Sequence, residues 1–137
     1  MSSKVWGIFL SPGRRIRTII KGNNEVVHVQ IRLVETNTPS KTLSLTVAEL
    51  QLLPITKILE SENNCHYGIY NGRRTVDISY DIDEDDIILT LYRANDFSEW
   101  KQQSSINFTK EEFELFNTCI SEILENVSNR VLNNIVH

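Results

Sequence analysis

Two arginine pairs are the residues of this sequence whose type and spacing point most clearly to chemistry. Each pair follows a glycine and opens a segment of alternating apolar residues, at Gly13-Arg14-Arg15 and again at Gly72-Arg73-Arg74. Other cations and several aromatic residues lie on segments of the same kind. Arg and Lys clustered along strands bind phosphates, and exposed rings stack on nucleobases. The pattern is typical of a site that binds an anionic polymer; the alternative interpretation is that these residues form only solvated strand faces and core rings.

The histidines give no sign of a catalytic site. His28, His66 and His137 lie far apart, with no Cys or Ser nucleophile motif nearby. The sequence contains neither a glycine-rich phosphate loop nor the spacing of zinc ligands. The acidic run Asp81–Asp86 lacks the glycine and the terminal glutamate of a calcium loop. We expect no enzymatic activity, no metal site and no cofactor.

A strand followed by a helix, with the same pattern of residues, occurs twice. In both copies apolar residues alternate, which predicts a short half-buried strand. A Thr then caps a helix, and a Glu three residues later can complete a capping box. Thr46 and Glu49 hold these places within Lys41–Leu59, and Thr109 and Glu112 hold them within Ser104–Leu124. A duplicated unit of this kind implies two similar subdomains that bury their apolar faces against each other.

Three further strands are expected before each copy, so the predicted fold is α+β. It comprises two tandem ββββα units, residues 1–61 and 62–137, that form an intramolecular pseudo-dimer with curved antiparallel sheets and packed helices. Apolar and polar residues alternate along Val26–Val34, which predicts one buried face and one face carrying Arg, Gln and His. Pro54 should kink the first helix or split it in two. The second helix is predicted to run nearly to the end of the chain.

Charge is distributed unevenly between the two halves. The net charge is −4, but residues 1–61 hold 8 Lys and Arg against 4 Asp and Glu, a net of +4. Residues 62–137 hold 6 against 14, a net of −8. This asymmetry predicts one basic working face. Acidic residues that merely solubilise the second half are the alternative interpretation.

The sequence also bears on location. No apolar run approaches the roughly 20 residues that cross a bilayer, and the first residues lack the layout of a secretory signal. Cys65 and Cys119 form no close motif and are most simply buried thiols. We expect an intracellular protein in a reducing compartment, with no membrane partner.

The strand and helix phrases resemble the positive-cofactor-four family of transcriptional coactivators, which bind single-stranded DNA. Val29-Gln30-Ile31-Arg32 and Lys41–Leu50 are similar to that family's I-D-I-R strand and K-G-I-S-L-N-P-E-Q-W segment. In the second unit the similar phrases are Leu89-Thr90-Leu91-Tyr92-Arg93 and Ser105–Phe113. The family's chain carries one unit and forms a homodimer, so the resemblance implies that this tandem contains its own dimer.

The resemblance also implies which residues contact nucleic acid. The residues carried over by position are Arg14, Arg15, Arg17, Lys21, Arg32, Lys41, Arg73, Arg74, Tyr80, Arg93 and Trp100. Further aromatic candidates are Trp6, Phe9, Tyr67, Tyr70 and Tyr92. Asp81–Asp86 is acidic where the family often carries basic residues, so we expect the first unit to dominate binding.

Two functions from different classes remain open. The first is a sequence-tolerant binder of single-stranded DNA or RNA that acts in transcription or replication, nuclear or virus-associated if the resemblance holds. The second is a protein-interaction or assembly module that has kept the fold without binding nucleic acid, favoured by the acidic second half. The closing helix could serve as a homo-oligomer contact.

Overall fold

The protein contains two antiparallel sheets and a few helices, a mixed arrangement of the class that the sequence predicts. The computed structural model describes residues 4–10, 15–22, 27–33 and 41–135. The first sheet is built from β1 (Lys4–Leu10), β2 (Ile16–Gly22), β3 (Val27–Leu33) and β4 (Lys41–Thr46). The second is built from β5 (Cys65–Asn71), β6 (Arg74–Asp81), β7 (Asp86–Ala94) and β8 (Trp100–Phe108). In both sheets the strands lie in chain order, each antiparallel to the next.

Helices follow the last strand of each sheet. After β4 come α1 (Val47–Leu52) and α2 (Ile55–Glu60), and after β8 comes the long helix α3 (Lys110–Ile135). The break between α1 and α2 falls at Leu53 and Pro54, where Leu53 is extended with a ψ of 125°. The residue before a proline is pushed out of the helical region. Of the two outcomes predicted at Pro54, a kink or a split, the structure shows the split into two helices.

Both predicted capping boxes are present. Thr46 Oγ1 accepts from the Glu49 backbone N–H at 3.2 Å, and Glu49 Oε1 accepts from the Thr46 N–H at 2.9 Å. Thr109 and Glu112 make the same two bonds, again at 3.2 and 2.9 Å. Each box satisfies two backbone donors that would otherwise lack partners where the helix begins. The strand-to-helix junction is therefore fixed in the same way after both sheets.

Alternation along the strands places one face of each sheet in a shared core. Val29 and Ile31 of β3 are buried, as the sequence predicts, and so are Val76 and Ile78 of β6. Where β8 meets α3, three phenylalanine rings pack together. The centroids of Phe108 and Phe113 are 5.4 Å apart and those of Phe108 and Phe116 are 5.3 Å apart. This spacing is typical of stable aromatic contacts.

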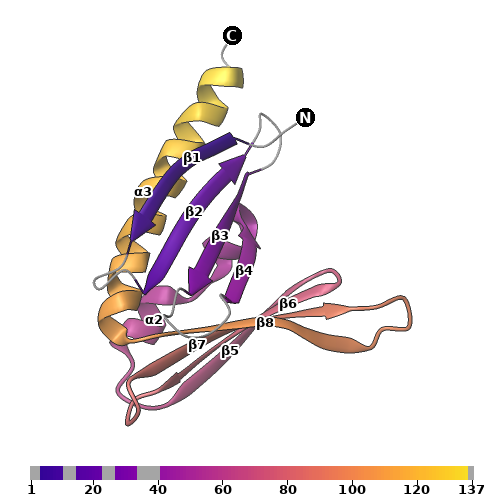
Figure 1. Ribbon diagram of the computed structural model, residues 1–137, viewed down its shortest axis with the longest axis vertical. Coiled ribbons are helices and arrows are strands. Elements are labelled where there is room, and N and C mark those ends of the chain that lie inside the picture. The colour runs from indigo at the N-terminus through magenta and orange to yellow at the C-terminus, as the bar shows by residue number, and fades with distance from the viewer. Residues whose placement is uncertain (1–3, 11–14, 23–26, 34–40, 136–137) are drawn as a thin grey trace.

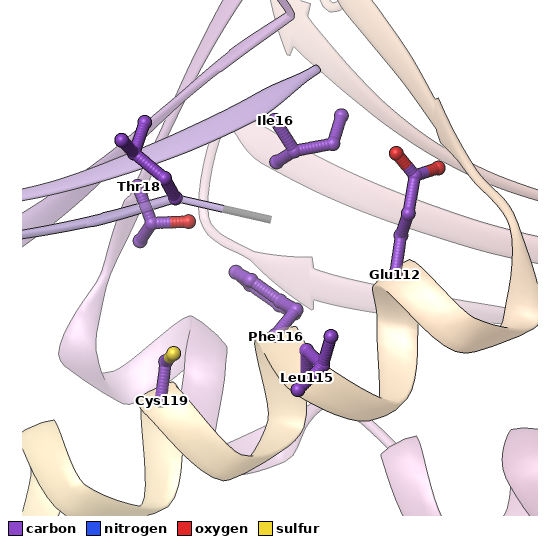
Figure 2. A pocket seen from close by; sticks show the side chains of 7 residues that line it. Ile16, Thr18, Glu112, Leu115, Phe116 and Cys119 are labelled. Carbon is purple, nitrogen blue, oxygen red and sulfur yellow. The ribbon is translucent and has the colours of Figure 1, made fainter. Parts of the chain in front are cut away.

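Helix α3 joins the two sheets. It contacts β2 of the first sheet and β7 and β8 of the second, and β4 contacts β8 directly. Figure 1 shows α3 running beside the first sheet, while the hairpins of the second sheet extend away from it. A cavity of about 20 Å³ is left between β2 and α3, and in Figure 2 Phe116 and Glu112 project from α3 toward Ile16. Such a volume holds one water molecule at most.

One strand differs clearly from the prediction. The repeated segment Ser104–Leu124 predicts that this strand begins at Ser104, whereas β8 begins at Trp100. Ala94 pairs with Trp100 and Arg93 with Lys101, and the register then shifts between Leu91 and Tyr92. The shift inserts an extra residue into β8, as in a β-bulge. Because the bulge interrupts the period-two pattern, alternation alone does not reveal the first part of this strand.

Candidate nucleic-acid interface

Arg15 is bound to the capping glutamate of α3. It lies immediately before β2, and its Nε donates to Glu112 Oε2 at 2.9 Å. Its Nη2 donates to the Asn107 carbonyl at 3.0 Å and forms an ion pair with Glu112 Oε1. The side chain of Glu112 is only 8% exposed. Arg15 thus neutralises a carboxylate that the packing of α3 has largely removed from water.

Arg74, in the second half of the chain, makes the equivalent contacts with Glu49, the capping glutamate of the first half. It is the first residue of β6, and its Nε donates to Glu49 Oε2 at 2.9 Å. Its Nη2 donates to Glu49 Oε1 at 3.0 Å and to the Ser44 carbonyl at 2.7 Å. The Glu49 side chain is fully buried. Each half of the chain therefore supplies an arginine that binds the capping glutamate of the other half.

The two glutamates are held as anions by these contacts. Burial by itself would raise the pKa of Glu49, but hydrogen bonds from Arg74, the Thr46 backbone and Asn71 outweigh it and hold that pKa below its ordinary value. At Glu112 burial acts in the same sense, and the hydrogen bonds from Arg15 and the Thr109 backbone lower the pKa below its ordinary value. Both carboxylates are thus charged at neutral pH.

Several predicted contacts with nucleic acid are engaged elsewhere. Arg15 and Arg74, predicted to bind phosphates, are committed to buried carboxylates. The ring of Tyr80 faces the core and is 6% exposed, so it is not accessible for stacking. Arg73 is exposed but donates to Asp96 Oδ1 at 2.6 Å. Arg14 lies outside the described residues, as do the side chains of Trp6 and Phe9.

The outer face of the first sheet brings together three other predicted cations, Arg17, Arg32 and Lys21. Arg17 of β2 lies directly opposite Arg32 of β3, and Lys21 lies opposite His28. All four side chains are half-buried. In the described part of the chain, Arg17 makes no ion pair, and its Nε is buried without a hydrogen-bond partner. Like charges directly opposite each other across two strands repel. An anion bound between the two guanidinium groups would be attracted by both.

The second sheet carries acidic residues at three of the four positions that correspond to Arg17, Arg32, Lys21 and His28 of the first sheet. We take Thr46 and Thr109, the first residues of the two capping boxes, as equivalent and follow the strand pairings of each sheet from there. Arg17 then corresponds to Asp77, and Arg32 corresponds to Thr90. The same comparison matches Lys21 with Asp81 and His28 with Asp86, which pair across β6 and β7. The residues are visible in the sequence, but their correspondence can be recognised only when the register of both sheets is known.

Gly68 and His66 fix the position of Asp77. His66 Nε2 lies 3.6 Å from Asp77 Oδ2. A Cβ at Gly68, which pairs with Asp77, would lie 3.1 Å from Asp77 Oδ1. The absence of a side chain at Gly68 therefore leaves space for this carboxylate on the outer face.

Aromatic side chains gather at the far end of the second sheet. Ladder pairing puts Tyr70, Thr75, Tyr92 and Gln102 in one row across its four strands, with Trp100 one step beyond on the same face. Tyr70 is 78% exposed and Trp100 is 45% exposed. We call this end of the second sheet, residues 70–75 and 92–102, the aromatic arm. Next to the aromatic arm, β8 contacts β4 of the first sheet, where Ser104 Oγ donates to the Thr42 carbonyl at 2.6 Å.

The aromatic arm also carries the remaining predicted cation of the second unit. Arg93 is exposed and lies directly opposite the exposed Lys101, on the face away from Trp100. Phe97, at the tip between β7 and β8, is 85% exposed and was not predicted as a contact. Lys41, at the start of β4, is exposed as well. The arm thus offers rings on one face and cations on the other.

No protein-family model matches this sequence, and no curated protein matches it either. Among the residues described, no helix has the length and apolar character needed to cross a membrane. The same residues contain no group of three or more His, Cys, Asp or Glu side chains placed to hold a metal ion.

Proposed function

We propose that this chain binds single-stranded nucleic acid across the outer face of its first sheet. The observation that carries the proposal is the cross-strand pair of Arg17 and Arg32, flanked by Lys21. Two like charges on neighbouring strands favour a phosphate that bridges them. The resemblance to the positive-cofactor-four family, in which single-stranded DNA lies along such a sheet, supports the same function.

The aromatic arm would then supply the base contacts. It adjoins β4, the edge strand of the first sheet, through the bond from Ser104 to Thr42 and the bond from Arg74 to Ser44. A nucleic-acid strand bound across β2, β3 and β4 would therefore extend to Tyr70, Tyr92 and Trp100. Stacking on exposed rings tolerates any sequence, because every base has a π face. The expected ligand is an unpaired strand of mixed sequence.

We further propose that the two ββββα units are copies of one another and form an intramolecular pseudo-dimer. The reciprocal pairs of Arg15 with Glu112 and Arg74 with Glu49 support this, because a two-fold interface repeats each contact with the two sides exchanged. The acidic outer face of the second sheet would repel phosphate. The proposed pseudo-dimer therefore binds one strand rather than two.

Fluorescence anisotropy with a labelled oligothymidine at two ionic strengths tests the proposal. Binding should weaken as salt rises, with a log–log slope of about −0.7 for each phosphate contact. The double variant R17S/K21S should bind more weakly and lose about 1.4 from the magnitude of that slope. K57S/K110S removes the same charge from residues on α2 and α3 and is the matched control, expected to bind like the parent.

Circular dichroism of both variants should confirm that they remain folded. An unmodified protein that binds no oligonucleotide even at low salt would eliminate the proposal. Equal loss of affinity in K57S/K110S and R17S/K21S would show that net charge alone drives binding, and the assignment to the first sheet would fail.

A further inference from the structure

The outer faces of the two sheets carry opposite charges at matching positions. Arg17 and Lys21 on β2 correspond in register to Asp77 and Asp81 on β6. Both pairs are four residues apart on one strand, a separation of about 13 Å. Charge of one sign on the first sheet is therefore repeated with the other sign, at the same spacing, on the second.

The acidic face is also hollowed. Two open, shallow depressions lie side by side and share Asp81 and Ile88. Asp86, Glu84 and Arg15, which is paired with Glu112, line the first, and His66 and Ser79 line the second. Open surface of this kind is accessible to the side chains of a partner. The carboxylates are spread along strands rather than gathered, and those described are not placed to hold a metal ion.

Each face contains a buried polar atom that lacks a partner among the described residues. On the first sheet this atom is Arg17 Nε, and on the second it is Thr75 Oγ1, whose residue is 7% exposed and lies two positions before Asp77. Nearly all buried polar groups in proteins have hydrogen-bond partners. Because both atoms are already covered by the chain's own atoms, a docking partner would reach them only if the neighbouring side chains moved.

We propose that the basic outer face of one copy docks on the acidic outer face of a second copy. The contact is heterologous, because it joins two different surfaces, and it can continue from copy to copy. Its charges attract over the range of the Debye length, about 10 Å at 0.1 M salt. This self-association goes beyond the proposed function and needs no nucleic acid.

Sedimentation velocity of the full chain without nucleic acid tests the proposal. The parent protein should associate with rising concentration at about 50 mM salt and become monomeric at about 500 mM. The acidic-face variant D77N/D81N/D86N and the basic-face variant R17Q/K21Q/R32Q should each remain monomeric alone. Mixed in equal amounts, they should form a dimer and nothing larger, because each retains one intact face. E114Q/E122Q/E125Q changes charge at three exposed positions of α3 and should associate like the parent.

A parent protein that stays monomeric at low salt overturns the proposal, as does a mixture of the two variants that stays monomeric. Association that persists in both face variants would instead assign the contact to another surface, such as α3. If the parent stays monomeric but binds an oligoarginine peptide, and D77N/D81N/D86N does not bind it, the acidic face binds a different, basic partner. That result would overturn docking between copies. Since nucleic acid is absent, a negative result here leaves the proposed function standing on its own test.

If the proposed function also holds, nucleic acid and the second copy compete for the same basic face. Adding oligothymidine to the associated protein should then release single copies that each carry one oligonucleotide. Self-association that survives a saturating amount of bound oligonucleotide would separate the two surfaces and contradict a shared basic face.

Discussion

Arg74 donates two hydrogen bonds to Glu49, a buried residue that also completes the capping box at the beginning of α1. The same carboxylate thus fixes a strand-to-helix junction locally and binds the other half of the chain. Arg15 and Glu112 repeat the arrangement. The local structure of each helix and the packing of the two halves therefore depend on the same two side chains.

Replacing Arg74 with Met should destabilise the protein strongly. The substitution leaves Glu49 charged and buried without its main partner, and breaking a buried pair in this way costs about 3–5 kcal/mol. The neighbouring variant R73M is the matched control. Arg73 pairs with Asp96 on the surface, and an exposed pair contributes about 1 kcal/mol or less. Urea unfolding of both variants measures the difference, and equal losses would contradict a structural role for Arg74.

Stability should fall in acid through Glu49 and Glu112. Both have a folded-state pKa below the ordinary value of 4.5. Their contribution is therefore complete above about pH 4.5 and is lost as the pH falls through the lower folded pKa values. Urea unfolding between about pH 7 and pH 3 should show this loss. In E49Q/E112Q the loss should be smaller, because neither residue titrates, and an unchanged pH dependence would assign it to other carboxylates.

The local elements could be predicted because their causes are local. Thr46 with Glu49 and Thr109 with Glu112 are signals three residues long, and Pro54 breaks a helix wherever it occurs in the interior. The burial of Val29 and Ile31 likewise follows from the alternation along one strand. These features do not depend on where the rest of the chain lies.

The roles of the arginines could not be predicted, because their partners are distant in sequence. Arg15 binds a residue 97 positions away and Arg74 binds one 25 positions away. A guanidinium at the start of a strand is the same sequence signal whether it binds phosphate or a buried carboxylate. Tyr80 also has the sequence pattern of an exposed ring near a hairpin, but its register places it toward the core.

Replacing Trp100 with Ala should weaken oligonucleotide binding without unfolding the protein. Trp100 is partly exposed on the aromatic arm, and the loss of one stacking contact costs about 1–3 kcal/mol. Tyr80→Ala provides the contrast, because it removes a buried ring and should cost about 3–5 kcal/mol of stability. Anisotropy titrations at a temperature where both variants are folded should show weaker binding for W100A alone. Parent-like binding by W100A would exclude this ring from the site.

Transferring the arginine pair to the second sheet should create a second binding face. Asp77 and Thr90 are the register equivalents of Arg17 and Arg32, so D77R/T90R reproduces the cross-strand pair, and Gly68 leaves space beside position 77. With two phosphate contacts at the new site, the affinity for the second oligonucleotide should fall with salt with a log–log slope of about −1.4. Isothermal titration calorimetry should then find two oligonucleotides per chain in place of one. D77S/T90S, which removes the carboxylate without adding cations, should still bind one. A single site in D77R/T90R would mean that the paired arginines are insufficient for binding, and the role of Arg17 and Arg32 would have to be reassigned.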